Sequence, residues 1–417
     1  MAVSTGVRPA AGVLVRKYGG TSVADDASVR RVARSVAAAR QDGRPTVVVV
    51  SAQGHTTDDL LARAAAFGAG ASREVDQLLG TGEIASAALL ALALRALGVP
   101  ATSLTGAQAG IGAYGPAGAA VVAGVDPTRL HRLLAAGEVP VVAGFQGVDA
   151  RGDLLTLGRG GSDTTAVALA GALGAQRCEI WTDVDGVFSA DPRAVPDARP
   201  LPAVGVDVMV EMAFAGARVL HSRAVELAAA REVPLLVRNT FSAAPGTTIE
   251  GNTVLEEFGI TAVTHDPDVV RVLVRTARTD LAAPLLEILA GQNVGADLVA
   301  RSGPYEEEFR MGFTIRDSDA TRVLPALRDA VSTVDGTVVV DGDVGKVSLV
   351  GVGLLNRPAH TARMLGALSA AGIPTSWVSV SQLRTSVIVP RDRLLAAVTL
   401  LHDAFGLGAA VHEGARG

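Results

Sequence analysis

Short apolar runs and helical patterns alternate along the first part of the chain. Continuous apolar or β-branched runs are typical of buried strands. They cover Gly12–Val15, Thr46–Ser51, Val139–Gly144, Cys178–Trp181 and Leu235–Val237. Helical spacing of apolar residues predicts helices over Ala27–Arg40, Asp58–Ala66, Ser86–Leu97 and Thr164–Leu173. This alternation favours a mostly parallel sheet with helices on both faces, whose ligands bind at the carboxyl ends of the strands.

Beyond Gly251 a different pattern occurs twice. A β-α-β-β-α unit is predicted first, and a second copy follows it. The first copy comprises Val269–Arg275, Ala282–Gly291, Val294–Val299, Phe309–Ile315 and Thr321–Ala330. The second comprises Lys346–Val352, Thr361–Ala371, Thr375–Val380, Ser386–Val389 and Arg391–Phe405. Two copies of one unit imply a duplicated small domain.

Composition agrees with an α/β chain of more than one domain. The 417 residues are 49% hydrophobic but only 3% aromatic, which indicates a core of small aliphatic side chains. A net charge of −5 gives no basic surface, so nucleic acid is not expected as a partner. The single cysteine, Cys178, cannot form an intramolecular disulfide. We expect its side chain to be an unreactive part of the core, and we expect a cytoplasmic protein. The apolar stretch Ile84–Leu94 is too short to span a bilayer, and no signal-peptide pattern precedes Val13.

The most informative segment is the glycine-rich turn at Leu157–Asp163, which runs directly into an apolar helix. The first amides of a helix lack partners within the helix and bind anions well. Gly158, Gly160 and Gly161 let the backbone approach a ligand closely, and Arg159 offers a planar fork of donors. Ser162 and Asp163 can cap the helix or face the ligand. The alternative is an ordinary helix start with a Ser-Asp cap.

Two further turns have the same character. Lys17 stands beside Gly19 and Gly20 after the first predicted strand, which suits neutralisation of phosphate. The spacing is not that of a Walker A loop. The segment Ile180–Arg193 places acidic, hydroxyl and basic groups after another strand. Its Asp-Gly and Asp-Pro pairs can also be simple turn formers.

Together these motifs resemble the aspartate kinase family of the amino-acid kinase superfamily. They are Lys17–Ser22, Ser51-Ala52, Gly82-Glu83, Val141–Gly147, Gly158–Asp163, Thr182–Gly186, Asp191–Arg193 and Val219–His221. The resemblance runs in order over residues 13–250 and more loosely to 407. It implies an amino-acid kinase fold at 13–250, a mostly parallel sheet sandwiched by helices. A flexible extension at 1–12 precedes it, and two ferredoxin-like βαββαβ ACT-type domains at 259–335 and 345–410 follow it.

The resemblance also implies the reaction. ATP, with Mg²⁺ held mainly by its phosphates and no metal site on the protein, would phosphorylate the β-carboxylate of L-aspartate. The product, 4-phospho-L-aspartate, begins the synthesis of the aspartate-family amino acids. A carboxylate is already a nucleophile, so the site must supply positioning and charge neutralisation rather than a general base.

Residue roles follow from the same resemblance. Lys17 and Asp163 are the expected catalytic residues, with Lys17 on the transferring phosphoryl group. Glu83 is expected to face the aspartate ammonium group and Arg159 a substrate carboxylate, with Ser51, Thr57 and Ser162 completing that pocket. The nucleotide would be bound by Lys17, Gly19, Gly20, Thr21, Ser22, Gly160, Gly161, Thr182, Asp183, Phe188, Arg193 and Arg218.

Simpler interpretations stand beside some of these roles. Glu83 can be a solvated charge near a helix start, and Thr57 can be the N-cap of the helix beginning at Asp58. Asp185 can be a turn former or a site residue. His55 is expected to be a surface loop residue.

Departures from the family pattern concern the nucleotide site and control. Arg218 stands where a phosphate-binding Lys is usual, and Phe188 stands where Tyr is usual. In the repeats, Asp280–Ala283, Ala300–Gly303, Arg357–Ala359 and Ser381-Gln382 replace the turns and polar pairs typical of ACT effector sites. We therefore expect weak inhibition by lysine and threonine. The ACT-like region is still expected to form a homodimer or a higher homo-oligomer.

Two alternative functions stay open from sequence alone. One is a sister kinase that acts on glutamate, N-acetylglutamate or UMP. The other is a catalytically weak paralogue that serves as an amino-acid-binding regulatory subunit. Retention of Lys17, Glu83, Arg159 and Asp163 argues against the second alternative.

Overall fold

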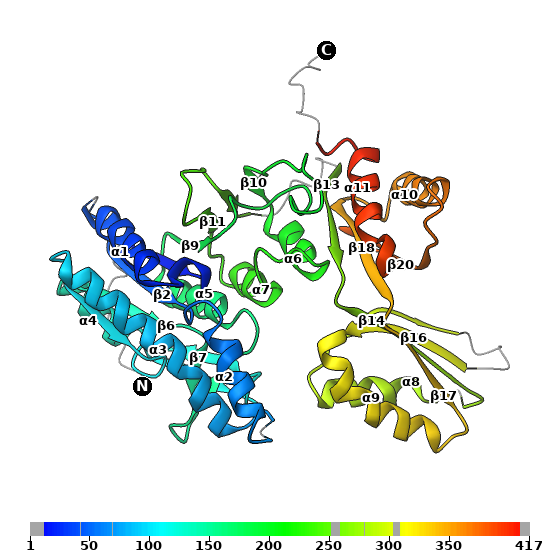
Figure 1. The fold of residues 1–417 in the computed structure, drawn as a ribbon, viewed down its shortest axis with the longest axis horizontal. Helices are drawn as coiled ribbons and strands as arrows, with labels where there is room; N and C mark the ends of the chain where they lie inside the picture. The colour runs from blue at the N-terminus through cyan, green and yellow to red at the C-terminus, as the bar shows by residue number, and fades with distance from the viewer. Residues whose placement is uncertain are drawn as a thin grey trace, which may run out of the picture. The chain divides into compact units, whose positions relative to one another are not determined.

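The structure is a computed structural model that describes residues 12–41, 43–68, 70–251, 259–278, 280–302 and 309–408. These residues form two compact units (Figure 1). The first contains the described chain up to Val187, Pro200–Ala213 and 218–251, and the second contains Phe188–Arg199, Phe214–Ala217 and 259–408. Of the extension predicted at 1–12, only Gly12 is among the described residues.

The first unit is built on an eight-stranded sheet. Its strands are β1 (Leu14–Tyr18), β2 (Thr46–Val50), β3 (Ala101–Leu104), β6 (Val139–Ala143), β9 (Arg177–Thr182), β10 (Ala203–Val204), β11 (Leu235–Asn239) and β12 (Thr247–Ile249). Their order is β10-β12-β11-β9-β1-β2-β6-β3, and every neighbouring pair is parallel except β11 with β12. The predicted mostly parallel sheet is therefore confirmed.

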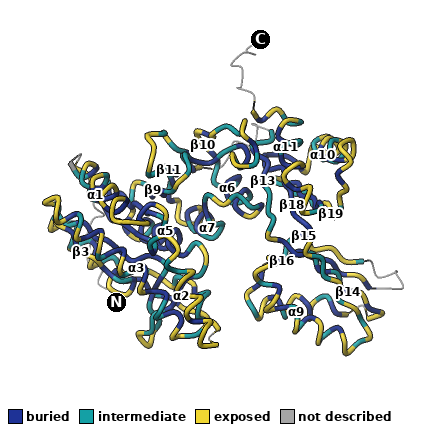
Figure 2. Tube along the Cα trace, viewed as in Figure 1, coloured by how far each residue is buried: buried dark blue, intermediate teal, exposed yellow. Residues whose placement is uncertain are grey.

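Helices cover both faces of this sheet (Figure 1). On one face, α1 (Asp26–Gln41) and α3 (Arg73–Ala96) share an apolar core with Tyr18, Val48 and Val141. On the other, α5 (Gly161–Leu173) packs with α7 (Ser222–Ala230) beside it, and α5 is buried along nearly its whole length (Figure 2). The remaining helical segments up to Phe214 are η1 (Thr21–Val23), α2 (Thr56–Ala65), α4 (Thr128–Ala135) and α6 (Val206–Phe214).

A smaller sheet of the first unit leads into the glycine-rich turn. Its strands are β4 (Ile111–Tyr114), β5 (Val121–Val125), β7 (Gln146–Val148) and β8 (Leu154–Thr156), in the order β5-β4-β7-β8. These strands were not predicted from the sequence, and β7 and β8 have only three residues each, too few for a clear pattern. Since β8 ends at Thr156, this sheet fixes where the turn at 157–161 begins.

Helix α3 is much longer than the predicted helix Ser86–Leu97. Gly80 and Gly82 lie in its interior, where added Cβ atoms would lie 2.8 Å from Leu154 and Ala52, so both glycines permit close packing. Among the described residues α3 alone is long and apolar enough to span a membrane, and the apolar stretch Ile84–Leu94, by itself too short for that, is part of it. Half of its apolar window is buried inside the protein, and it buries Asp76 and Glu83, as a core helix does.

The second unit contains two sheets of four strands each. The first has the order β15-β16-β14-β17 and the second β13-β18-β20-β19. The strands are β13 (Gly259–Asp266), β14 (Val269–Thr276), β15 (Asp297–Arg301), β16 (Phe309–Arg316), β17 (Thr337–Asp341), β18 (Val344–Val352), β19 (Ser376–Val380) and β20 (Arg384–Pro390). The helical segments are α8 (Ala282–Gly291), α9 (Asp317–Ser332), α10 (Pro358–Ala370), η2 (Arg391–Arg393) and α11 (Leu394–Ala404). The predicted duplication is thus present.

Strand β13 joins the sheet of the second repeat. It pairs with β18 along nearly its whole length, although residues 259–335 were expected to form the first repeat. The first repeat's own sheet begins at β14 and ends with β17 at Asp341. The chain therefore contributes one strand to the second repeat, then forms the whole first repeat, and finally returns to complete the second repeat.

The two repeats are joined by ion pairs on Asp297. Arg384 Nη1 and Lys346 Nζ lie 2.8 Å and 2.9 Å from Asp297 Oδ2. Partial burial raises the pKa of Asp297, but the hydrogen bonds and charges of Arg384 and Lys346 outweigh it and hold that pKa well below its usual range. Asp297 lies on β15 and its partners on β18 and β20, so both repeats belong to one compact unit.

Candidate active site

Lys17 lies on a strand rather than in the turn after it. The predicted strand ended at Val15, whereas β1 continues to Tyr18. Side chains alternate along a strand, so Lys17 points to the face opposite Tyr18, the face that carries α5. There Lys17 Nζ lies 2.6 Å from Asp163 Oδ1, and both side chains are 12% exposed. Strand β1 and helix α5 thus present a lysine and an aspartate as an ion pair.

The glycine turn before α5 depends on a left-handed backbone. Gly158 and Gly160 have φ of 72° and 68°. A Cβ on Gly160 would lie 2.2 Å from that of His221, so a side chain has no room there. Gly160 is the N-cap residue and no side chain caps the helix, so the interpretation of Ser162 and Asp163 as caps was wrong. Both lie in the first turn of α5, and Lys17 pairs with Asp163.

Asp76 and Arg223, which no sequence motif indicated, hold this turn. Asp76 of α3 accepts hydrogen bonds from Gly118 N at 3.0 Å and from Thr156 Oγ1 at 2.6 Å. Arg223 of α7 donates to Leu157 O at 2.8 Å and to Ala120 O at 2.7 Å. Neither residue lies in a local motif, because each acts on a distant loop.

Glu83 lies in the middle of α3 and is 3% exposed, so the interpretation as a solvated charge near a helix start was wrong. Its Oε1 accepts a hydrogen bond from Ala52 N at 3.2 Å, while its buried Oε2 has no partner among the described residues. Burial raises the pKa of Glu83 to about 7. A buried carboxylate with a free oxygen is suited to a cationic group of a ligand.

These groups meet in one cleft of the first unit, with a volume of about 810 Å³. Every residue predicted to bind the acid substrate lines it, together with the predicted catalytic pair and two turn glycines: Lys17, Ser51, Thr57, Glu83, Arg159, Gly160, Gly161, Ser162 and Asp163. Arg159 is exposed at the cleft surface. Helix α2 forms an apolar wall with Leu61 and Ala64. The cleft can therefore hold an anion next to Lys17 and a cation next to Glu83.

The start of helix α2 shows that Thr57 is not an N-cap, and the loop before it exposes His55 as expected. It begins at Thr56 after His55, so Thr57 lies inside the helix and is not its N-cap. The His55 side chain is 92% exposed, as expected for a surface residue, with Nδ1 3.8 Å from the carboxylate of Asp58. Gln53 Nε2 donates to Val23 O at 2.8 Å and so joins this loop to η1.

The predicted nucleotide residues belong to different parts of the fold. In the first unit, Gly19 follows β1, and its Cβ would lie 3.6 Å from Lys17 Nζ. Ser22 is buried, with its hydroxyl 2.7 Å from Thr240 Oγ1. Thr182 and Asp183 lie at the end of β9, and Arg218 precedes α7. Phe188 and Arg193 belong to the second unit.

Asp185 accepts hydrogen bonds from two residues of another loop. Its Oδ1 accepts hydrogen bonds from Asn239 Nδ2 at 2.8 Å and from Ser242 Oγ at 2.5 Å. Asp185 thereby ties the loop after β9 to the loop after β11.

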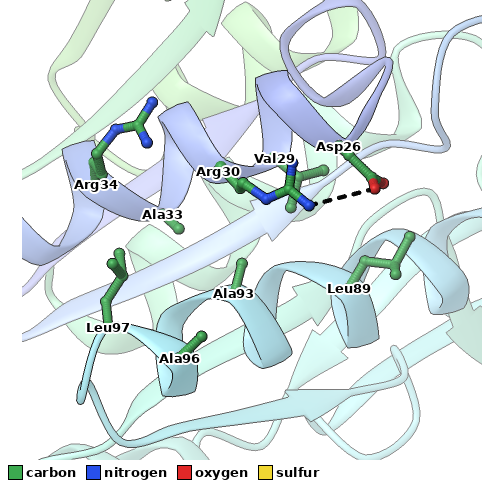
Figure 3. A pocket seen from close by; sticks show the side chains of 9 residues that line it. All are labelled: Asp26, Val29, Arg30, Ala33, Arg34, Leu89, Ala93, Ala96 and Leu97. Carbon is green, nitrogen blue, oxygen red and sulfur yellow. Dashed lines mark ion pairs between the residues drawn. The ribbon is translucent and has the colours of Figure 1, made fainter.

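A second hollow of about 350 Å³ lies between α1 and α3 (Figure 3). Its walls are mainly Val29, Leu89, Leu97 and alanines, and Arg30 pairs with Asp26 at 3.6 Å along its rim. None of the predicted site residues lines it. Within the described ranges no group of three or more His, Cys, Asp or Glu side chains could hold a metal ion. Cys178 is buried in β9, and burial raises its pKa.

The family comparisons agree with this geometry. The amino acid kinase family model matches residues 12–239, and an ACT domain model matches residues 347–405. The parallel sheet and its glycine turn thus belong to an amino acid kinase domain, and ACT-type repeats follow it.

Relatives over nearly the whole chain are aspartokinases. That of Mycolicibacterium smegmatis is 44% identical and the match covers 95% of this chain and 96% of the relative. That of Thermus thermophilus is 40% identical over 95% and 99% of the two chains. The crystal structure of E. coli aspartokinase III in complex with aspartate and ADP has the same fold, with a TM-score of 0.82 at 24% identity over 94% of this chain and all of that one. The chain belongs to the aspartokinases of the amino acid kinase family.

Proposed function

We propose that this chain transfers the γ-phosphoryl group of ATP to the β-carboxylate of L-aspartate and so forms 4-phospho-L-aspartate. This reaction would supply the synthesis of the aspartate-family amino acids. The observation that carries the proposal is the single cleft in which Lys17, Asp163, Glu83 and Arg159 meet. The names of the relatives support the same acceptor.

Each substrate charge would find an opposite charge in the cleft. The unpartnered Oε2 of Glu83 would accept a hydrogen bond from the aspartate ammonium group. Arg159 would bind a carboxylate through its fork of donors, and the hydroxyls of Ser51, Thr57 and Ser162 would complete the pocket. An acid without an ammonium group would leave Glu83 buried and unpaired, which disfavours its binding.

Lys17 would neutralise charge on the transferring phosphoryl group. Asp163 holds Lys17 Nζ in place, and the first-turn amides of α5 have no acceptor within the helix. Gly19 leaves the backbone beside Lys17 open to a phosphate group, because an added Cβ at this position would contact the ammonium group at 3.6 Å. ATP would bring Mg²⁺ on its phosphates, and Mg²⁺ supplies further charge neutralisation when bound.

Acceptor specificity tests this proposal. A coupled assay of ADP release over aspartate, glutamate, N-acetylglutamate and UMP should give turnover with aspartate and little with the others. Succinate, which has both carboxylates of aspartate but no ammonium group, is the matched control for Glu83. Turnover with glutamate or UMP above that with aspartate would contradict the proposal.

A further inference from the structure

Two short segments of the first unit lie in backbone contact beside the glycine turn. Residues 118–120 precede β5, and β8 ends at Thr156, where the chain enters the turn. Ala120 N donates to Thr156 O at 3.0 Å. A Cβ on Gly158 would lie 2.9 Å from Gly118 O, so the two backbones are close there as well. Since β5 and β8 are the two edge strands of the small sheet, this contact joins its opposite edges.

A buried carboxylate bridges the amides of the two segments. Asp76 lies in the first turn of α3 and is fully buried. Its Oδ1 accepts from Gly118 N at 3.0 Å, and its Oδ2 accepts from Thr156 N at 3.0 Å. The Thr156 hydroxyl also donates to Oδ1 at 2.6 Å. Hydrogen bonds to an ionised acceptor are roughly twice as strong as neutral ones. Asp76 therefore holds the two segments at a fixed separation.

A guanidinium bridges the carbonyls of the same two segments. Arg223 of α7 donates from Nη1 to Leu157 O at 2.8 Å and from Nη2 to Ala120 O at 2.7 Å. Its rigid planar fork suits two acceptors at once. The backbone bond from Ala120 N to Thr156 O lies between the two bridges. Asp76 and Arg223, from distant parts of the sequence, thus extend one backbone hydrogen bond on both sides.

Arg159 follows these segments directly and depends on them for its position. Its exposed side chain lines the cleft, as do Asp76, Gly118 and Thr156. Within the part of the chain that the structure describes, no hydrogen bond or ion pair fixes the Arg159 guanidinium. The backbone of the turn alone therefore determines where this guanidinium can reach in the cleft.

We propose that Asp76 and Arg223 are positioning residues for the acid substrate: by joining the two segments they hold the turn that presents Arg159 to a substrate carboxylate. This inference rests on the proposed kinase function. Without the carboxylate of Asp76, two buried backbone amides lose their acceptor and must find another one. The segments would then separate, and the turn with Arg159 would shift.

The side of the cleft that would bind the phosphoryl group has separate support. Phe145 N donates to Thr165 Oγ1 at 3.1 Å, and this hydroxyl donates to Gly161 O at 2.8 Å. These bonds attach the first turns of α5 to the chain after β6. Lys17 on β1 pairs with Asp163 of the same helix. The loss of either bridge should therefore weaken binding of the acid and leave binding of the nucleotide unchanged.

Steady-state kinetics of Asp76→Asn test the inference. The amide has the size of the carboxylate, but in either orientation its NH2 group faces a backbone N–H, so one bridge bond is lost. We expect the KM for aspartate to rise roughly tenfold to a hundredfold, with the KM for MgATP unchanged. Arg223→Met should have the same selective effect. Calorimetric titration with aspartate in the presence of a non-hydrolysable ATP analogue gives the comparison without turnover.

A double variant shows whether the effect of Asp76 passes through Arg159. Arg159→Ala alone should raise the KM for aspartate. Adding Asp76→Asn to it should have little further effect, because the side chain to be positioned is already gone. If Asp76→Asn raised the KM for aspartate as much in the Arg159→Ala background as in wild-type protein, the inference would be overturned.

Glu179 of β9 is the matched control for the loss of a buried carboxylate. It is fully buried on the sheet face that carries α1, where it accepts from Trp181 Nε1 at 3.1 Å and pairs with Arg16 at 2.9 Å. Glu179→Gln should lower the thermal midpoint as Asp76→Asn does, but it should leave the KM for aspartate unchanged. General destabilisation is thereby separated from positioning.

The outcomes distinguish the two proposals. Wild-type protein that forms no acyl phosphate with aspartate would overturn the proposed function. Active wild-type protein with an unchanged KM for aspartate in Asp76→Asn, or with an equal rise in the KM for MgATP, would overturn the inference alone. If Asp76→Asn does not fold, Arg223→Met decides by the same two constants, because Arg223 is only partly buried.

Discussion

The pair of Lys17 and Asp163 defines the site at the scale of single residues. Their contact of 2.6 Å requires β1 to extend to Tyr18 and α5 to begin at Gly161, and neither boundary follows from the local apolar pattern. The residue types were predictable because the motifs around Lys17 and Asp163 resemble a family. The supporting residues Asp76 and Arg223 were not predictable, since their partners lie far away in the sequence.

Replacing Lys17 with Ala should reduce kcat far more than it raises the KM for aspartate. The ammonium charge is needed most as negative charge gathers around the transferring phosphoryl group. Loss of one such preorganised contact typically costs about 2.7 to 4 kcal/mol, roughly a hundredfold to a thousandfold in rate. Arg30→Ala, on the exposed rim of the hollow between α1 and α3, is the surface control. A change in KM alone would contradict the role of Lys17.

Glu83 should make aspartate binding dependent on pH. The carboxyl group must be ionised to bind an ammonium group, and its pKa is raised to about 7. The KM for aspartate should therefore rise as the pH falls through about 7, while Glu83→Gln should bind aspartate poorly at every pH. A flat KM profile between pH 6 and 8 would contradict this assignment.

The stability of the ligand-free protein should show the opposite trend. A carboxyl group whose folded pKa is raised contributes stability below its unfolded pKa, and that stability is lost as the pH rises through the folded pKa. Ionisation of Glu83 should thus lower the thermal midpoint between about pH 4.5 and 7. Glu83→Gln should remove this loss, and scanning calorimetry across that range with both proteins is the measurement.

At the scale of elements, patterns predicted existence and type better than boundaries. The β-branched run at Thr46–Val50 and the helical spacing of α1 were read correctly, because local periodicity determines both. The start of α3 was missed because glycine usually breaks helices, and here Gly80 and Gly82 serve close packing instead. The place of β13 was missed because strand pairing depends on distant partners.

Two glycine substitutions test this packing. Alanine normally stabilises a helix interior over glycine by about 0.5 to 1 kcal/mol. Gly366→Ala in α10 should follow that rule, since nothing lies within 4 Å of its added Cβ. Gly82→Ala should instead destabilise by about 1 to 3 kcal/mol and raise the KM for aspartate, because its Cβ would meet Ala52 at 2.8 Å, next to the hydrogen bond to Glu83. Urea unfolding of both variants gives the change in the free energy of unfolding. If Gly82→Ala stabilised the protein as much as Gly366→Ala, the close contact at Gly82 would be refuted.

At the scale of the whole molecule, each repeat of the duplicated region has its own apolar core, and the loss of effector turns stays a prediction from the sequence. Leu281, within the segment Asp280–Ala283 that departs from the family pattern, is buried in the core of the first repeat. The apolar strands β14 and β18 of the region expected to form a homo-oligomer are interior strands of their own sheets. Their apolar character is thereby explained within one chain, and subunit pairing through this region stays a prediction.

Lysine and threonine, alone or together, should inhibit only weakly. An effector shifts an equilibrium only by its differential affinity for two states, and a site without its ligand-holding turns offers little of it. Initial rates with either amino acid up to millimolar concentration, alongside sedimentation of the full chain, are the measurement. Strong inhibition at submillimolar effector would show that the altered turns still bind it.

The central claim is that the cleft of the first unit phosphorylates aspartate on its β-carboxylate. Hydroxylamine converts an acyl phosphate to a stable hydroxamate, so the product can be trapped directly. Wild-type protein with MgATP and L-aspartate should give aspartyl β-hydroxamate, and Lys17→Ala should give it roughly a hundredfold to a thousandfold more slowly. No aspartyl hydroxamate from folded wild-type protein at saturating MgATP would contradict the account.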